Sequence, residues 1–176
     1  RPGDYIVMTK TAGIEGTAIL ANDFEERLRK SGVSNSVIND AKRYYRFISV
    51  VKEALWLAKH AAVSAMHDPT EGGIIGGLYE LSKASRCGFK VWGELIPVSK
   101  TTHEICRALN VDPLKLISSG ALLATVKKAE ITVLNKIKAK IIGKMTDKRN
   151  ERWLIDKTRR ISIDGAITDE LWRIIP

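Results

Sequence analysis

Asp68, Thr70 and the glycine pair Gly72-Gly73 stand close together in the segment AMHDPTEGGIIGGL, residues 65–78. A carboxylate, a hydroxyl and flexible backbone beside a helix start could bind a phosphate or another anion. The first turn of a helix has unpaired N–H groups and the positive end of the helix dipole, and both attract negative charge. The segment is therefore a candidate ligand-binding turn.

The same segment also has a purely local explanation. Asp68 could cap the helix, Pro69 suits its first turn, and Glu71 follows three residues after the cap, which is the pattern of a capping box. Both interpretations predict a helix from Pro69 to about Ser85. Local structure alone therefore accounts for three residues of the motif.

The glycine pairs Gly72-Gly73 and Gly76-Gly77 need a further reason, because each glycine inside a helix costs about 0.8 to 1 kcal/mol relative to alanine. Their presence predicts a close approach to the backbone. A neighbouring strand or helix could make that approach, and so could a bound anion. The sequence leaves these alternatives open.

Two more glycine-bearing turns adjoin apolar runs. Gly13 and Gly16 follow a strand predicted over residues 5–9 and predict a tight turn into a helix. A second turn, directly before a strand predicted over residues 121–126, consists of Ser118, Ser119 and Gly120. Its two hydroxyls could hydrogen-bond an anion, although such a turn is also common without a ligand.

Helices and strands alternate along the rest of the chain. We expect helices over 17–31, 34–60 (as one or two pieces), 101–109 and 130–141, a buried strand over 62–66, and strands over 89–92 and near 141–144 and 160–163. A cap at Thr101 or Thr102 is expected for the third of these helices. With no internal repeat, the pattern predicts a single α+β domain over residues 1–176, a layered α/β/α sandwich with a mixed sheet.

Positive charge is concentrated in one segment. The net charge is +9, and residues 127–160 hold twelve Lys or Arg against four Asp or Glu, which is +8 and leaves about +1 for the rest. A solvated helix face bearing Lys136, Lys138 and Lys140 would explain much of it. Stacking aromatics are not interleaved with the charge, so nucleic-acid binding is not expected. An interface with an acidic partner or ligand stays open.

The cysteines, the apolar runs and the overall composition limit the kind of protein that this chain can be. Cys87 and Cys106 lack CxxC spacing and nearby paired histidines, so we expect two buried, reduced thiols and no metal site. No apolar run is long enough to span a bilayer and no export signal is present, which favours a cytoplasmic protein. The chain lacks an initiating Met and is expected to be cut from a longer protein. It contains no glutamine and much Lys, Arg and Ile, a weak indication of a thermophilic source.

Taken in chain order, these motifs resemble the C-terminal domain of the AIR synthase superfamily, and most closely its HypE-type hydrogenase maturation branch. The resemblance is carried by GDYIVMTKTAGIEGTAIL, MHDPTEGGIIGGLYELSKAS, LNVDPLKLISSGALLATV and the terminal DELWRIIP. It extends over essentially all 176 residues, and the DPTxGG segment is its most specific part.

The resemblance implies the second domain of a two-domain, ATP-using enzyme that activates an amide or carboxyl-type oxygen. The first domain would form a homodimer and supply most ligands of ATP and Mg²⁺, so no cofactor is expected on this chain alone and the isolated domain is expected to be inactive. By this resemblance the cleft-facing residues are Asp68, Thr70, Gly72 and Gly73, with Gly13, Gly16, Ser118, Ser119 and Gly120 along the edge. It identifies no catalytic residue.

Three departures from the HypE pattern stand beside the matches. Gly13-Ile14-Glu15-Gly16 replaces G-D-H-G, Ser118-Ser119-Gly120-Ala121 replaces N-E-G-K, and Pro176 stands where those chains end in cysteine. Each removes a group that maturation chemistry would use. A HypE-like reaction is therefore open and is not implied by the resemblance alone. The alternative function is a non-catalytic module that binds an acidic protein or nucleic acid through the basic segment 127–160.

Overall fold

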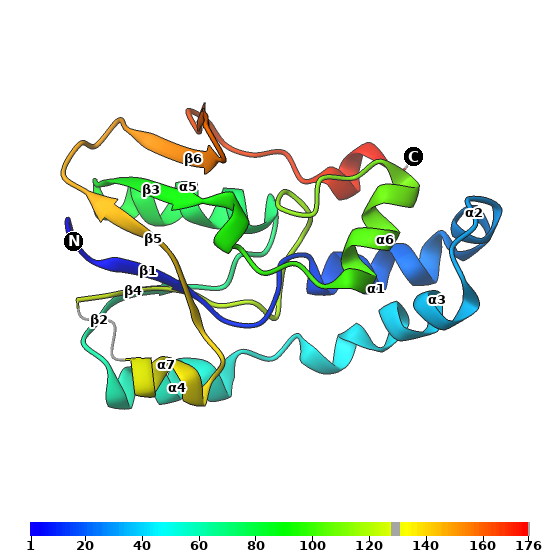
Figure 1. Ribbon diagram of the computed structural model, residues 1–176, viewed down its shortest axis with the longest axis horizontal. Coiled ribbons are helices and arrows are strands. Elements are labelled where there is room, and N and C mark those ends of the chain that lie inside the picture. The colour runs from blue at the N-terminus through cyan, green and yellow to red at the C-terminus, as the bar shows by residue number, and fades with distance from the viewer. Residues whose placement is uncertain (128–130, 176) are drawn as a thin grey trace.

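A seven-stranded mixed sheet is the centre of the protein, which a computed structural model describes over residues 1–127 and 131–175 (Figure 1). The strand order is β2-β4-β1-β5-β3-β6-β7, with only β3 and β6 parallel among neighbouring strands. The strands are β1 Tyr5–Met8, β2 Val63–His67, β3 Gly88–Trp92, β4 Leu123–Val126, β5 Lys140–Thr146, β6 Arg152–Asp156 and β7 Arg159–Ser162. The predicted α+β class with a mixed sheet is confirmed.

Helices cover both faces of this sheet. Alternate residues of β1 serve opposite faces: Ile6 and Met8 pack in one core with helix α5 (Gly73–Ser85), and Val7 packs in another with Leu57 of helix α4 (Val51–His60). Helix α7 (Ile131–Lys136) lies beside α4 (Figure 1). The expected α/β/α layering is therefore present.

A third apolar core lies among helices beyond one end of the sheet (Figure 1). It is formed by α1 (Ile14–Asp23), α2 (Glu25–Lys30), α3 (Asn35–Lys42) and α6 (Lys100–Leu109), with residues of the C-terminal tail. Short 3₁₀ helices complete the structure at η1 (Arg43–Phe47), η2 (Gly93–Leu95) and η3 (Glu170–Arg173). This helical group packs against the loops that leave the sheet.

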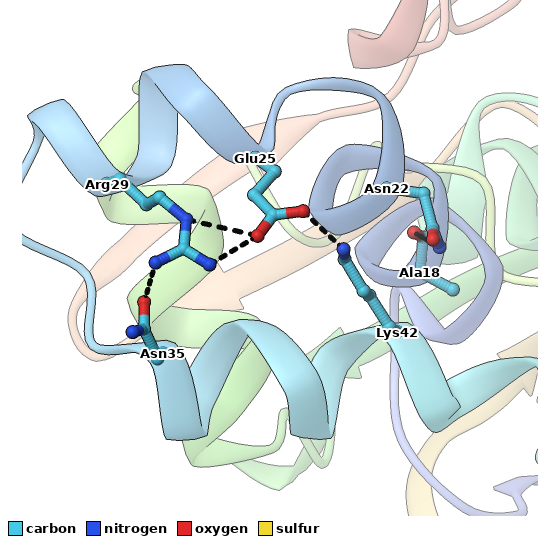
Figure 2. A network of polar contacts seen from close by, with 6 residues as sticks. All are labelled: Ala18, Asn22, Glu25, Arg29, Asn35 and Lys42. Atoms are coloured by element: carbon cyan, nitrogen blue, oxygen red, sulfur yellow. Dashed lines mark hydrogen bonds and ion pairs between the residues drawn. The ribbon is translucent and has the colours of Figure 1, made fainter.

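Glu25 joins α2 to α3 in a surface network (Figure 2). Its Oε1 accepts from Arg29 Nε at 3.0 Å and Nη2 at 2.5 Å, its Oε2 accepts from Lys42, and Arg29 also donates to Asn35. The hydrogen bonds from Lys42 and then Arg29 lower the pKa of Glu25. Every oxygen of this carboxylate is thus partnered.

Several predicted boundaries were wrong. The predicted capping box does not form, because α5 begins at Gly73 and Gly72 is its cap residue, without a side-chain cap of the expected kind. Ser99, and neither Thr101 nor Thr102, caps α6, and its Oγ accepts from Thr102 N at 2.9 Å. The physical reason at α5 is the left-handed backbone at Gly72, which separates Asp68 from the helix.

The C-terminal third and one edge strand also differ from expectation. β2 is an edge strand and only partly buried, and β6 lies where no strand was predicted. The basic helix ends at Lys136 rather than residue 141, since Lys138 adopts positive φ and β5 begins at Lys140. The predicted helix start at Glu130 and the chain end at Pro176 lie outside the described residues.

Cys87 and Cys106 are both buried free thiols, as predicted. Burial raises the pKa of Cys106 to about 12, so its thiol is protonated at neutral pH. Across residues 1–127 and 131–175, no helix has the length and apolar character needed to cross a membrane.

Candidate functional site

Three of the predicted turns meet at the same end of neighbouring strands, because of the directions in which those strands run. β1 and β2 both run antiparallel to β4, which lies between them. Met8 and His67 accordingly face the same residue, Leu123. The loops that follow β1 and β2, and the loop that precedes β4, therefore leave the sheet side by side.

Hydrogen bonds between these loops hold them together. Gly13 N donates to Ser118 Oγ at 2.7 Å, and Ser118 N donates to Pro69 O at 3.1 Å. The Ser118 hydroxyl in turn donates to Leu116 O at 2.7 Å, and the residue is fully buried. Ser118 thus joins the turns, and its hydroxyl is already committed within the protein.

The glycines of the motif are explained by close packing. Gly72 and Gly73 both have positive φ, at 74° and 60°. A Cβ atom on Gly73 would lie 2.6 Å from Leu116 O, and one on Gly72 would lie 2.8 Å from Ile167 O. Both distances are shorter than a carbon and an oxygen can approach. Of the alternatives left open by the sequence, the structure supports backbone packing at these two positions.

Three backbone N–H groups at the start of α5 are also occupied from within the chain. Gly72 N donates to Asp169 Oδ2 at 2.8 Å, and Ile75 N donates to Leu114 O at 3.1 Å. Gly73 N donates to Thr70 O at 3.1 Å. In this conformation the C-terminal tail supplies a carboxylate at Gly72 N, where the sequence had left a bound anion open as one alternative.

Exposure divides the nine predicted site residues into two groups. Those that shape the turns from within are buried: Gly13, Gly16, Gly72, Gly73, Ser118 and Gly120. Those that solvent can reach are Asp68, Thr70 and Ser119. Direct contact with a ligand is open to the second group only.

Asp68 is the most unusual of these residues. Its Oδ1 is buried and has no hydrogen-bond partner among the described residues. Burial raises the pKa of Asp68 and the charge of Glu15 raises it further, while the Gly120 N–H group and the charges of His67 and Lys10 act in the opposite direction. An ionised oxygen that lacks a donor is an unfavourable arrangement, which a bound ligand could relieve.

Lys10 lies beside the candidate site, and the sequence analysis did not single it out. It follows β1 in the left-handed region, with φ 52°, a strained conformation for a residue with a side chain. Its Nζ donates to Phe47 O at 3.0 Å and Ser49 O at 2.6 Å, and lies 3.1 Å from Glu53 Oε1. The lysine therefore connects the loop cluster to the segment before α4. No sequence signal marks this conformation.

A cavity of about 220 Å³ adjoins this connection, lined by Lys10, Thr11, Ile14, Tyr44, Phe47 and Ser99. A larger groove of about 590 Å³ lies along α6, where Lys100, His103, Glu104 and Arg107 line it. That groove includes none of the nine predicted site residues. Within the described ranges, no three His, Cys, Asp or Glu side chains are grouped to hold a metal ion.

Known proteins share both the sequence pattern and the fold. The chain is 29% identical over 126 residues to the carbamoyl dehydratase HypE of Rhizobium leguminosarum bv. viciae, covering 72% of this chain and 33% of that protein. It is 29% identical over 187 aligned positions to a putative hydrogenase expression/formation protein of Methanocaldococcus jannaschii, covering 98% and 51%. The chain thus spans about half or less of the length of these relatives.

Solved structures agree at lower identity. The crystal structure of E. coli HypE superposes with a TM-score of 0.77 at 22% identity, covering 99% of this chain and 53% of that one. The structure of a hydrogenase maturation protein HypE in complex with ATP gives a TM-score of 0.68 at 20% identity, with the same coverage of 99% and 53%. The model of the family described as AIR synthase related protein, C-terminal domain, matches residues 1–155. The chain therefore belongs to the AIR synthase-related family and represents its C-terminal domain.

Proposed function

We propose that this chain is the substrate- and phosphate-side domain of an ATP-dependent enzyme, whose site is completed by a nucleotide-binding domain. The observation that carries the proposal is the half-buried Asp68 carboxylate, with its unpaired oxygen, where three loops of the sheet edge converge. The relatives named as HypE extend well beyond the region that this chain matches, and one HypE structure contains ATP. A cytoplasmic homodimer of the completed protein belongs to the same proposal.

The residues present fit a Mg²⁺–ATP complex held mainly by another domain. Mg²⁺ usually keeps several waters and binds through one or two carboxylates plus phosphate oxygens, so it does not need an all-protein cage. The partly exposed carboxylate of Asp68 could accept a hydrogen bond from a magnesium-bound water or a substrate N–H, and Glu15 is close enough to affect its pKa. Bound Mg²⁺–ATP would supply a transferable phosphoryl group and offset the charge that develops during transfer.

Each accessible residue has a role in this proposal. Asp68 orients the substrate by accepting a hydrogen bond at the accessible part of its carboxylate. Thr70 and Ser119 offer hydroxyl groups to the substrate or a phosphate, and Lys10 supplies fixed positive charge from its anchored position. The buried glycines and Ser118 hold the loops close enough for these groups to act together.

The reaction class is activation of an amide or carboxyl-type oxygen by phosphorylation, which converts that oxygen into a leaving group. Carbamoyl dehydration, named for the HypE relatives, is one reaction of this class. The turns Gly13–Gly16 and Ser118–Ala121 lack the acid, histidine and lysine of the HypE pattern, so we propose the class and not the HypE substrate.

The test is ATP turnover by the protein assembled with its nucleotide-binding domain, comparing wild type with Asp68→Asn. We expect a loss of about 10- to 100-fold in the variant, the range seen when a supporting polar contact is removed from such a site. Asp164→Asn is the matched control, since Asp164 is exposed and lies outside the loop cluster. Equal turnover in wild type and Asp68→Asn, or no nucleotide binding by the assembled protein, would overturn the proposal.

A binding module that uses the basic segment remains the alternative. Its charges are dispersed in the structure: Arg152 is buried against Ser82, and Lys144 lies over the Tyr5 ring. If nucleic-acid binding were the function, affinity would fall steeply with salt concentration. Salt-dependent binding without any ATP turnover would favour this alternative.

A further inference from the structure

Five of the nine large apolar side chains that are exposed in the described ranges occur within eleven residues, on η1, on the link that follows it and on α4. Two of them, Val51 and Leu55, are the most exposed of all nine, at 60% and 66%. The others are Tyr45, Phe47 and Ile48. Exposed apolar residues that are concentrated in one segment mark an interaction site more often than scattered ones do. We call residues 45–59 the α4 face.

The α4 face results from how little of α4 the domain itself buries. Leu57 is the one residue of the helix that is fully buried in the core, and Trp56 donates from Nε1 to Val133 O of α7 at 3.0 Å. Val51 and Leu55 are four residues apart, so they form a stripe on one side of the helix. The domain therefore leaves an apolar helix side without a partner among the described residues.

Positive charge surrounds this stripe. Arg46, Lys52 and Lys59 are exposed and have no ion pair among residues 1–127 and 131–175. Glu53, the one acid within the α4 face, already pairs with Lys10 at 3.1 Å. An apolar centre with a cationic rim is complementary to a partner whose contact surface is apolar at its centre and acidic at its edge.

The α4 face is continuous with the candidate site. Lys10 Nζ contacts the backbone oxygens of Phe47 and Ser49, and a Cβ atom on Gly120 would lie only 2.7 Å from Phe47 O. A domain seated on the α4 face would therefore stand next to the loops that carry Asp68. Relatives of about twice this length, of which the chain spans 51% and 53%, contain a further part of comparable size.

We propose that the α4 face is the docking surface of the nucleotide-binding domain, and that the contacting surface of that domain carries carboxylates opposite Arg46, Lys52 and Lys59. This inference rests on the proposed function, because it names the partner that completes the same site. Docking covers Val51 and Leu55 and positions the nucleotide beside Asp68.

The experiment compares this chain alone with the chain assembled with its nucleotide-binding domain, whether that domain is on the same polypeptide or a separate one. Hydrogen–deuterium exchange should show slower exchange of amides in residues 45–59 upon assembly. The double variant Val51→Glu/Leu55→Glu should weaken association by at least about tenfold, as measured by analytical ultracentrifugation or by loss of that protection. Leu95→Glu is the matched control, since Leu95 is also apolar and exposed, at 44%, but lies on η2. Both variants are substituted at the surface, and circular dichroism verifies that they fold.

Two results separate this inference from the proposed function. Assembly that is unaffected by Val51→Glu/Leu55→Glu, with no change in exchange over residues 45–59, overturns the docking surface even if ATP turnover persists. Protection of residues 45–59 that the double variant abolishes supports the docking surface, even if the assembled protein fails to bind ATP and the proposed function is lost.

Discussion

Two carboxylates, Asp169 and Asp68, lie beside the short segment before α5. They differ in exposure and in hydrogen bonding. Asp169 is 1% exposed, and each of its oxygens accepts a backbone N–H at 2.8 Å, from Gly72 and from Leu171. Asp68 is only half-buried, yet its Oδ1 has no partner in the described structure. Burial raises the pKa of both carboxyl groups. The direction of the pKa shift therefore does not distinguish the two acids, whereas the unpaired oxygen of Asp68 does.

The C-terminal tail packs on the residues at the start of α5. Ile167 covers Gly72, Asp169 accepts from it, and Trp172 donates to Glu71 Oε1 at 2.6 Å. The tail thus closes the helix start that the sequence suggested for an anion, while the neighbouring Asp68 is left available.

Gly73→Ala should give the largest loss of stability. The added Cβ would clash with Leu116 O and Leu114 O, at 2.6 and 2.7 Å, and the position has φ of 60°. Overpacking and left-handed backbone together predict a loss of about 3 to 5 kcal/mol, measured by urea unfolding. Gly165→Ala is the control, because nothing lies within 4 Å of its added Cβ. Similar stability of the two variants would contradict the packing explanation.

Asp169→Ala should be the next most damaging change. It removes the acceptor of two buried N–H groups, on Gly72 and Leu171, and unsatisfied buried donors cost about 1 to 3 kcal/mol each. We expect a total loss of about 3 kcal/mol by urea unfolding, with faster amide exchange at Gly72. Asp169→Asn keeps one acceptor oxygen and should lose about half as much. An unchanged midpoint in Asp169→Ala would show that the tail does not stabilise α5.

Asp68→Asn should slightly increase the stability of the protein at pH 7, in contrast to the two losses above, and should leave the fold intact. The folded protein holds the Asp68 proton more tightly than the unfolded chain does, so the stability of the wild type declines as pH rises from about 4 through the raised pKa. The variant lacks this decline. It should therefore be more stable than the wild type at pH 7, by less than about 1 kcal/mol because the residue is only half-buried. Thermal unfolding at pH 4 and pH 7 measures the difference, and a less stable variant at pH 7 would contradict the account.

Glu25→Gln should have the smallest effect. Its cation partners lower the pKa of Glu25, so the stability that it contributes is present above about pH 4.3 and is lost as the pH falls through the lowered value. The network of Figure 2 is on the surface, where salt screens ion pairs. Thermal unfolding should show a small destabilisation at low salt that disappears at about 1 M salt, near 3 Å screening length. A large loss that persists in high salt would contradict a purely surface role.

The sequence predicted the elements whose pattern is local. The apolar runs of β1, β3 and β4 and the three glycine-bearing turns are visible in single segments, and the resemblance predicted that the turns face a common cleft. The order of strands then follows only from pairing, which the sequence does not display. β6 was missed because Arg152 looks like a surface residue, although its side chain is buried against Ser82.

Long-range contacts account for the rest of the unpredicted features. Gly72 and Asp169 are 97 residues apart, and Lys10 reaches the segment before α4 across 37 and 39 residues. A DPTEGG motif predicts a capping box on local grounds, and the tail overrides it by supplying a different carboxylate. Local propensity cannot anticipate such a replacement.

Carbon-13 NMR of the aspartate carboxyl groups can test whether Asp68, and not Asp169, is the carboxylate that faces the ligand. The titration of Asp68 and of Asp169 would be followed in the protein assembled with its nucleotide-binding domain, with and without Mg²⁺–ATP. Binding should lower the raised pKa of Asp68, because its carboxylate gains a hydrogen-bond donor, and should leave that of Asp169 unchanged. A nucleotide that binds without affecting Asp68, or that shifts Asp169 instead, would contradict the assignment of Asp68 as the ligand-facing carboxylate.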